Sequence, residues 1–221
     1  MHCDETWKRV HPEQGADFAY DQVSGLDEII HLMLSPRFSD ALIYAAELHK
    51  QQRRKGTTIP YFSHLMAVCS LVMENGGDED CAIAALLHDA IEDQGGDATR
   101  QVIATKFGPR VADIVSGCTD ADEIPKPPWR ERKEAYIAHL VTASPDVLLV
   151  SLSDKVHNAR AILMDFRAIN NEVWDRFSPG KTGTLWYYRA LVGAFHDAGA
   201  HSGLQTELNR IITELERLSH E

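Results

Sequence analysis

Four side chains that can bind a metal ion or transfer protons fall within six positions of the stretch CAIAALLHDAIEDQGG, residues 81–96. They are His88, Asp89, Glu92 and Asp93, and the rest of the stretch up to Ile91 is apolar or small. In a helix, where successive residues are about 100° apart, Glu92 and Asp93 extend the two rows begun by His88 and Asp89. Burying such charges unpaired is costly, and a divalent cation offsets the cost. The pattern indicates a metal site on a buried helix.

Two further apolar segments carry similar polar residues. VLLVSLSDKVHNARAIL contains Asp154, His157 and Asn158, and Asp154 and Asn158 share a helix face because they are four residues apart. His64 begins the apolar run SHLMAVCSL. Imidazole and carboxylate together suit manganese, iron or zinc better than calcium. The predicted metal ligands are His64, His88, Asp89 and Asp154, and His157 is expected to be structural.

Each of these residues taken alone also has a simpler interpretation. A histidine such as His64 at a helix start is commonly part of the cap, and Asp89 and Asp154 are compatible with surface charges on amphipathic helices. Glu92 and Asp93 precede a glycine pair and fit a solvated helix end. The adjacent His88 and Asp89 are harder to explain in this way, because the apolar pattern around them indicates a buried helix.

Composition narrows the class of protein. The chain has 221 residues, 44% of them hydrophobic and 25% charged, as in ordinary globular proteins. The net charge of −11 argues against a nucleic acid polymer as the partner. There is no apolar run of about 18 residues and no signal-peptide pattern, so we expect no membrane association and a cytoplasmic location. The four cysteines are scattered, which fits neither a zinc knuckle nor a disulfide framework. A homo-oligomer is compatible with this composition.

Helical periodicity dominates the chain and predicts an all-α fold with a single helical domain. We expect residues 1–36 to form an arm with one short helix in LDEIIHLML, residues 37–200 to form the domain, and residues 201–221 to form a helix packed on it. Ser39 and Ser63 are the predicted caps of the first two domain helices. Further helices are expected over residues 78–94, 97–107, 109–118, 130–143, 146–166, 180–198 and 203–218.

Basic residues with access to such a metal site are candidates for binding an anionic ligand. Arg54 and Lys55 lie on the expected loop before His64, and guanidinium groups suit bidentate phosphate contacts. The alternative is that Arg54 and Lys55 belong to a solvated run of surface charges and bind no ligand. Lys181 lies in PGKTG, which lacks the glycine spacing of a phosphate-binding Walker loop. Whether Lys181 and Tyr187 contact a substrate is left open.

The order of these motifs resembles the HD-domain metal-dependent phosphohydrolases. RKGTTIPYFSH, ALLHDAIED, FGPRVADIVSGCTD and LSDKVHNAR follow the order and spacing of the hydrolase domain of the Rel/Spo proteins, and they are also similar to the small alarmone hydrolases. The resemblance runs from about Phe38 to Arg160. It implies a helical HD-domain bundle that binds one Mn²⁺ and releases pyrophosphate from the 3′ position of guanosine tetra- or pentaphosphate.

The resemblance also implies roles for individual residues. It makes His64, His88, Asp89 and Asp154 the ligands of the metal. Glu92 and Asp93 match the acidic pair that positions and activates water, and Arg54, Lys55 and Asn158 match residues that contact the nucleotide. The expected function is therefore a metal-dependent phosphohydrolase whose partner is a small phosphorylated nucleotide.

One departure from the family pattern concerns the substrate. The family often has a threonine near the substrate where this chain has Ala161. A hydrolase for another phosphorylated metabolite, such as a nucleotide monophosphate or NADPH, is therefore an alternative. A second alternative is a non-catalytic HD protein that binds a nucleotide. The presence of both Glu92 and Asp93 argues against this alternative.

Overall fold

The computed structural model describes residues 34–120 and 125–220, which are helical with no strand among them. The predicted all-α fold is confirmed. The arm over residues 1–36 lies outside the described residues up to position 33, as does almost all of its expected helix. No helix in the described ranges is long and apolar enough to cross a membrane.

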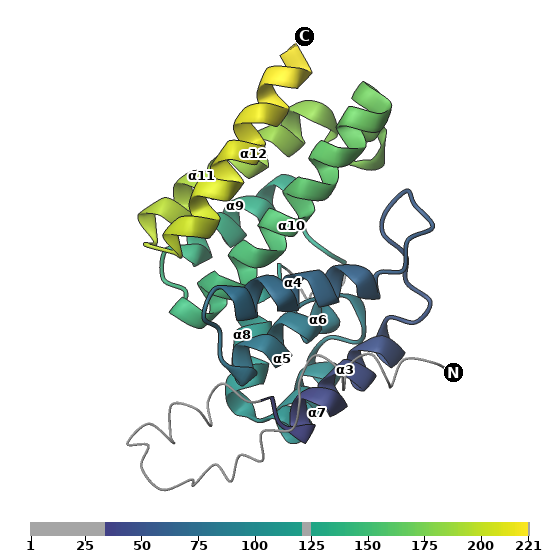
Figure 1. The fold of residues 1–221 in the computed structure, drawn as a ribbon, viewed down its shortest axis with the longest axis vertical. Helices are drawn as coiled ribbons and strands as arrows, with labels where there is room; N and C mark the ends of the chain where they lie inside the picture. Colours follow the sequence, from purple (N-terminus) through teal and green to yellow (C-terminus); the bar gives the residue numbers. More distant parts are fainter. Residues whose placement is uncertain (1–33, 121–124, 221) are drawn as a thin grey trace, which may run out of the picture. The chain divides into compact units, whose positions relative to one another are not determined.

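The elements follow the predicted order along the chain (Figure 1). They are α3 (Pro36–Leu48), α4 (Phe62–Glu74), α5 (Glu79–Leu87), α6 (Ala90–Asp93), α7 (Asp97–Phe107), α8 (Pro109–Cys118), α9 (Trp129–Leu140), α10 (Pro145–Ile169), the 3₁₀ segment η1 (Asn170–Arg176), α11 (Gly180–Asp197) and α12 (Ser202–His220).

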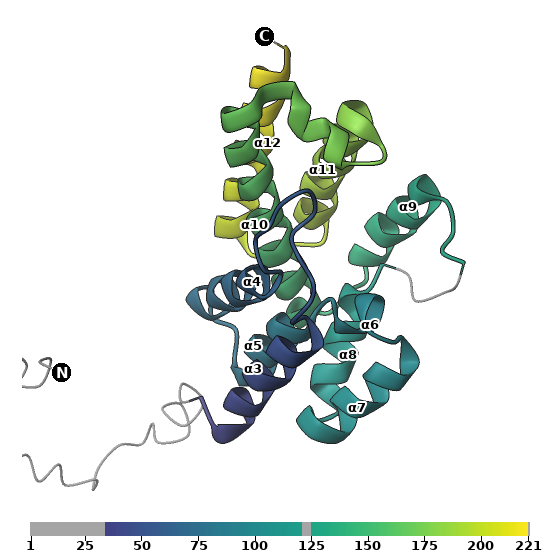
Figure 2. The ribbon, with the colours of Figure 1, turned by 90° about the vertical axis from the view of Figure 1, so that its right-hand side faces the viewer.

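Two hydrophobic clusters form the core. In the first, α3, α4, α5, α7 and α8 surround fully buried side chains such as Leu65, Ile83 and Ile103. In the second, α10, η1, α11 and α12 pack around Leu191, Leu208 and their neighbours. Figure 2 shows α9 beside α11, against which it packs. Burial of apolar side chains, on every side of α5 and on the inner faces of the helices around it, is therefore what assembles the domain.

Helix α10 joins the two clusters, and Figure 1 shows it running from the lower helices to the upper ones. Val147 and Val150 belong to the first cluster, whereas Leu152 and Val156 belong to the second. Ser144 begins the helix by accepting a hydrogen bond from the Val147 N–H, and Pro145 occupies the first turn. Polar residues on this helix are thus held at the centre of the domain.

Two predicted helix caps are wrong. Ser35, not Ser39, caps α3, because the helix already begins at Pro36. Helix α4 has no side-chain cap, and the Ser63 hydroxyl donates to the Pro60 carbonyl oxygen instead. Proline in the first helical turn moved the start of α3 towards the N-terminus.

The expected continuous helix over residues 78–94 is interrupted at His88 and Asp89. Helix α5 ends at Leu87, and α6 begins at Ala90. Asp89 has φ −99° and ψ 0°, in the sparsely populated bridge region where active-site residues often lie. The Asp93 N–H still donates to the Asp89 carbonyl oxygen at 2.9 Å, so the two segments stay coupled. The two adjacent candidate ligands therefore lie in a turn rather than inside a helix.

Candidate metal centre and nucleotide pocket

His64, His88 and Asp154 come together at the centre of the domain from three separate parts of the chain. His64 lies on α4, His88 follows α5, and Asp154 lies on α10. One potential ligand atom from each lies within 4.8 Å of the others, and all three residues are buried. Asp89 adjoins them, with its Oδ2 3.0 Å from His88 Nε2 and 3.9 Å from His64 Nε2. The structure thus brings together all four predicted ligands.

The His88 ring is oriented as a metal ligand would be. Its Nδ1 lies 2.8 Å from the Ala85 carbonyl oxygen, so Nδ1 carries the proton and Nε2 faces the cluster. Burial lowers the pKa of His88, but Asp89 and Asp154 raise it by more, to a net value well above the usual range. The two carboxylates therefore favour a positive charge at Nε2, whether a proton or a metal ion supplies it.

The His64 ring is held by His157, whose Nδ1 lies 2.7 Å from His64 Nδ1. One of these nitrogens donates and the other accepts. Burial lowers the pKa of His157 to about 4, with repulsion from His64 adding to the effect, so His157 is neutral at pH 7. If His157 accepts, His64 Nδ1 carries its proton and Nε2 has a free lone pair that faces the cluster.

The chemistry of this donor set fits a divalent cation. His64 Nε2 lies 3.1 Å from Asp154 Oδ1, yet neither His64 Nε2 nor His88 Nε2 makes a well-directed hydrogen bond within the described residues. Two buried ring nitrogens that converge on carboxylate oxygens without bonding them are what a shared metal ion requires. Mixed nitrogen and oxygen ligands suit manganese, iron or zinc.

Neighbouring side chains support the two carboxylates. The Tyr61 hydroxyl donates to Asp89 Oδ2, and Lys155 Nζ donates to Asp154 Oδ2 at 2.6 Å. Asn158 Nδ2 donates to Asp154 Oδ1, so this residue contacts a candidate ligand. Sequence reasoning missed Tyr61 and Lys155. Tyr61 lies three residues before His64, about one helical turn away. This spacing could have identified Tyr61 as a neighbour of the site.

Glu92 and Asp93 lie on α6, next to the cluster but outside it. Lys126 Nζ lies 2.7 Å from Glu92 Oε1, and Gln52 Nε2 donates to Asp93 Oδ2 at 2.7 Å. Desolvation and then repulsion from Asp89 raise the pKa of Asp93 above its usual range, against the lowering effect of Gln52. A raised pKa suits a carboxylate that must accept a proton. Neither Lys126 nor Gln52 was singled out from the sequence.

A cavity of about 500 Å³ lies beside the cluster and contains Arg54, Lys55 and Asn158 in its lining. Its charged lining residues are Arg54, Lys55, Lys133, Lys155, Arg176 and Asp165. Arg54 also lies 5.9 Å from the centre of the Tyr61 ring. This basic lining contrasts with the net charge of −11 for the whole chain. The cavity therefore suits a small polyanion.

Gly56 lets the loop that carries Arg54 and Lys55 approach this cavity closely. Its φ is +71°, which disfavours other residues, and a Cβ atom there would lie 2.7 Å from Cδ of Arg176. Glycine at this position therefore brings the loop against Arg176 on η1.

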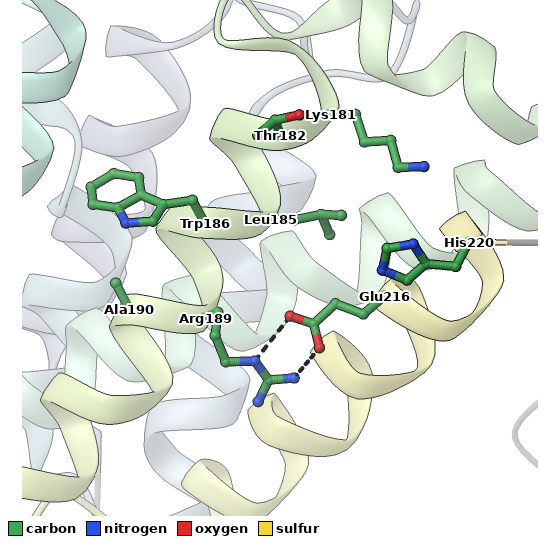
Figure 3. Close-up of a pocket in the computed structure, with 8 residues that line it drawn as sticks. All are labelled: Lys181, Thr182, Leu185, Trp186, Arg189, Ala190, Glu216 and His220. Carbon is green, nitrogen blue, oxygen red and sulfur yellow. Dashed lines mark hydrogen bonds and ion pairs between the residues drawn. The ribbon is translucent and has the colours of Figure 1, made fainter.

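Lys181 lies in a different pocket, between α11 and α12, together with Trp186, Arg189 and Glu216 (Figure 3). Its ammonium group donates to the Ser219 carbonyl oxygen. Arg189 pairs with Glu216 across the same pocket, as the dashed lines in Figure 3 show. Lys181 is absent from the lining of the cavity beside the cluster, whereas Tyr187 and Tyr188 line it.

Comparison with known proteins agrees with this geometry. The HD domain family matches residues 41–179. A guanosine-3′,5′-bis(diphosphate) 3′-pyrophosphohydrolase MESH1 from Xenopus tropicalis is 38% identical over 138 residues, covering 61% of this chain and 72% of the relative. The protein of the same name from Homo sapiens is 37% identical over 126 residues, covering 55% of this chain and 66% of the relative.

A solved structure described as "A metazoan ortholog of SpoT hydrolyzes ppGpp and plays a role in starvation responses" superimposes with a TM-score of 0.67 and 28% identity. The match covers 82% of this chain and 97% of that one.

The fold and the site together define an all-helical protein with a buried histidine and aspartate cluster that suits a divalent metal. The chain belongs to the HD domain family. The resemblance inferred from the sequence motifs is therefore confirmed.

Proposed function

We propose that this protein is a metal-dependent phosphohydrolase that releases pyrophosphate from the 3′ position of guanosine 3′,5′-bis(diphosphate). The observation that carries the proposal is the cluster of His64, His88 and Asp154, with ligand atoms within 4.8 Å of one another, beside a cavity whose charged lining groups are basic except for Asp165. The named activity of the relatives supports the substrate class.

The proposed metal ligands are His64, His88, Asp89 and Asp154, and the proposed ion is Mn²⁺. When bound there, a divalent cation lowers the pKa of a coordinated water and polarises a phosphoryl oxygen. The protein's own part is to hold the two imidazoles with Nε2 facing inward, through Ala85 and His157. Ligands from α4, from the turn after α5 and from α10 then share one site.

Proton transfer falls to the α6 carboxylates. Asp93, with its raised pKa, accepts a proton from the attacking water, and Glu92 orients that water. A new P–O bond forms from water to the phosphorus on the 3′ oxygen. The bond from that phosphorus to the ribose 3′ oxygen breaks, its electron pair stays on the ribose oxygen, and the proton from Asp93 neutralises it. Pyrophosphate and the nucleoside 5′-diphosphate are the products.

Nucleotide binding falls to Arg54, Lys55 and Asn158 in the cavity lining. Arg54 lies at the face of Tyr61 and is placed to contact phosphate or stack on a base. A small nucleotide in the cytoplasm, rather than a nucleic acid polymer, is the proposed partner, since the whole chain is acidic.

A second candidate function is hydrolysis of another phosphorylated metabolite. Ala161 lines the cavity, where it offers a methyl group in place of the hydroxyl that the family often has. A cavity without that hydroxyl favours a different substrate, such as NADPH or a nucleotide monophosphate.

A substrate panel distinguishes these functions. Purified protein loaded with Mn²⁺ is assayed with guanosine 3′,5′-bis(diphosphate), NADPH and guanosine monophosphate, and pyrophosphate and phosphate release are measured separately. Pyrophosphate release from the first compound alone is expected, and it should stop on chelation of the metal. Phosphate release from NADPH alone would favour the second function. Tight nucleotide binding without turnover of any compound would favour a non-catalytic role.

A further inference from the structure

A second group of polar side chains lines the same cavity as the loop that carries Arg54 and Lys55. Lys133 comes from α9, Lys155 from α10 and Tyr187 from α11. Only Lys155 lies within one of the motifs that carry the family resemblance, LSDKVHNAR. The contacts of the three residues show what kind of group they are arranged to bind.

Lys155 is the member nearest the candidate metal ligands. Its Nζ donates to Asp154 Oδ2 at 2.6 Å and lies 5.1 Å from the centre of the Tyr136 ring. Only 15% of its side chain is exposed. An ammonium group has three N–H donors, and Asp154 uses one of them. The remaining donors are available to a ligand in the cavity beside the metal cluster.

Lys133 lines the same cavity wall as Lys155, and the positive charge of Lys155 acts on it unfavourably. Lys133 Nζ is 2.7 Å from Asp120 Oδ2 and 5.0 Å from the centre of the Tyr187 ring. Burial lowers the pKa of Lys133, and repulsion from Lys155 lowers it further. Asp120 also pairs with Arg132, so its single negative charge does not neutralise both Lys133 and Arg132. An anion bound between Lys133 and Lys155 would relieve their repulsion.

Tyr187 adds a hydroxyl group without a partner. The residue is 7% exposed, and its Oη atom makes no hydrogen bond within the described residues. A buried hydroxyl left unpaired is costly, and such groups are rare in native proteins. Because Tyr187 lines the cavity, an oxygen atom of a ligand can be the missing partner.

We propose that Lys133, Lys155 and Tyr187 bind the terminal phosphoryl group of the substrate's 3′ diphosphate. This inference rests on the proposed function. Lys155 adjoins Asp154, so this wall lies next to the phosphorus that water attacks, whereas Arg54, Lys55 and Arg176 lie on the loop and on η1 and bind the other end of the nucleotide. The wall therefore selects a 3′ diphosphate over a 3′ monophosphate.

Tyr187→Phe and Lys133→Met test the proposal with small changes of shape. Both variants should bind pyrophosphate about tenfold more weakly than the wild-type protein, and kcat/KM for guanosine 3′,5′-bis(diphosphate) should fall by a similar factor. Affinity for inorganic phosphate should stay within about twofold, because a single phosphoryl group next to the metal and Lys155 does not extend to Lys133 and Tyr187. Calorimetric titration of the Mn²⁺-loaded protein measures both affinities.

Tyr136→Phe is the matched control. Tyr136 is also buried, its hydroxyl also lacks a partner within the described residues, and its ring contacts Lys155, but it does not line the cavity. Removal of the Tyr136 hydroxyl should leave the affinities for pyrophosphate and for inorganic phosphate unchanged. A thermal melt of each variant establishes that the fold is intact.

Two failures are distinguishable. If the wild-type protein hydrolyses guanosine 3′,5′-bis(diphosphate) and Tyr187→Phe and Lys133→Met bind pyrophosphate as tightly as it does, the phosphoryl wall is wrong and the function stands. If the wild-type protein releases no pyrophosphate but the two variants weaken pyrophosphate binding selectively, the proposed reaction is wrong and the wall stands as a diphosphate site.

Discussion

At the scale of single residues, His157 sets the orientation of a candidate metal ligand. The sequence predicts a structural role for His157. The distance of 2.7 Å between His157 Nδ1 and His64 Nδ1 indicates that this role is to hold the His64 ring. Residues that hold a metal-binding histidine commonly change metal affinity by 10- to 100-fold when they are removed. His157 is therefore a positioning residue for the metal centre.

We expect His157→Phe to weaken Mn²⁺ binding by at least about tenfold, because the His64 ring loses its partner. His139→Phe, at an exposed position, is the control and should bind the metal normally. Equilibrium dialysis with Mn²⁺ measures both. Equal affinity in the two variants would show that His64 needs no support from His157.

Substitutions of Asp89 and Glu92 should separate metal binding from orientation of the attacking water. Asp89→Ala removes a proposed ligand, so metal content and activity should fall together. Glu92→Ala should keep the metal and lose about 10²-fold in kcat, because the attacking water is no longer oriented. Metal analysis and steady-state kinetics on the same preparations measure these effects. An unchanged kcat in Glu92→Ala would remove Glu92 from the mechanism.

At the scale of elements, the N-terminus of α5 anchors the segment that ends in His88. Asp78 Oδ1 accepts a hydrogen bond from the Cys81 N–H, and Arg110 Nη1 lies 2.5 Å from Asp78 Oδ2. Burial alone would raise the pKa of Asp78, but these two contacts outweigh it and lower the pKa below its usual range. The carboxylate thus stabilises the folded state above its ordinary pKa and loses that effect as the pH falls through its lowered value.

We expect Asp78→Ala to lower the free energy of unfolding by about 1 kcal/mol at pH 7, through loss of the helix cap. Asp78→Asn keeps a capping oxygen but cannot ionise, so it should retain much of that stability and lose less on acidification below about pH 4. Urea unfolding at pH 7 and at pH 3 measures both variants. A loss on acidification as large in Asp78→Asn as in the wild type would contradict the assignment.

Most helices were predictable because their ends are marked locally. Gly108 and Pro109 separate α7 from α8 at the expected positions, since glycine ends helices and proline begins them. The break at His88 was not predictable, because the sequence there keeps an apolar helical pattern. Nothing local marks the turn, and the two residues lie where three helices converge.

The candidate site was predictable only where the chemistry shows in the residue type. His88 and Asp89 stand out in an apolar run, whereas Lys133 and Tyr187 look like ordinary helix residues. Their importance comes from contacts between α9, α10 and α11, which one sequence does not reveal. The role of Tyr61 likewise depends on its contact with Asp89.

At the scale of the whole molecule, metal binding and folding should be coupled. The candidate ligands come from α4, the turn after α5, and α10, so the unfolded chain does not hold them together. A ligand that binds only the folded state stabilises it by about 4 kcal/mol at roughly 1,000 times its Kd.

Saturating Mn²⁺ should therefore raise the Tm by roughly 10 °C, and a chelator should reverse the increase. Asp89→Ala is the control, because its Tm should respond much less to the metal. Differential scanning calorimetry measures the shift. The same increase in the variant and in the wild type would mean that the ion stabilises the protein from another place.

The path of α10 through both hydrophobic clusters has a consequence for hydrogen exchange. The amide protons around Asp154 lie where the two halves of the core meet, so local fraying cannot expose them. They should exchange with deuterium only when the entire domain opens. Weakening a distant contact in either half would then speed both the exchange of these amide protons and the dissociation of the bound ion. The dissociation rate of the ion would therefore report on the stability of the whole domain.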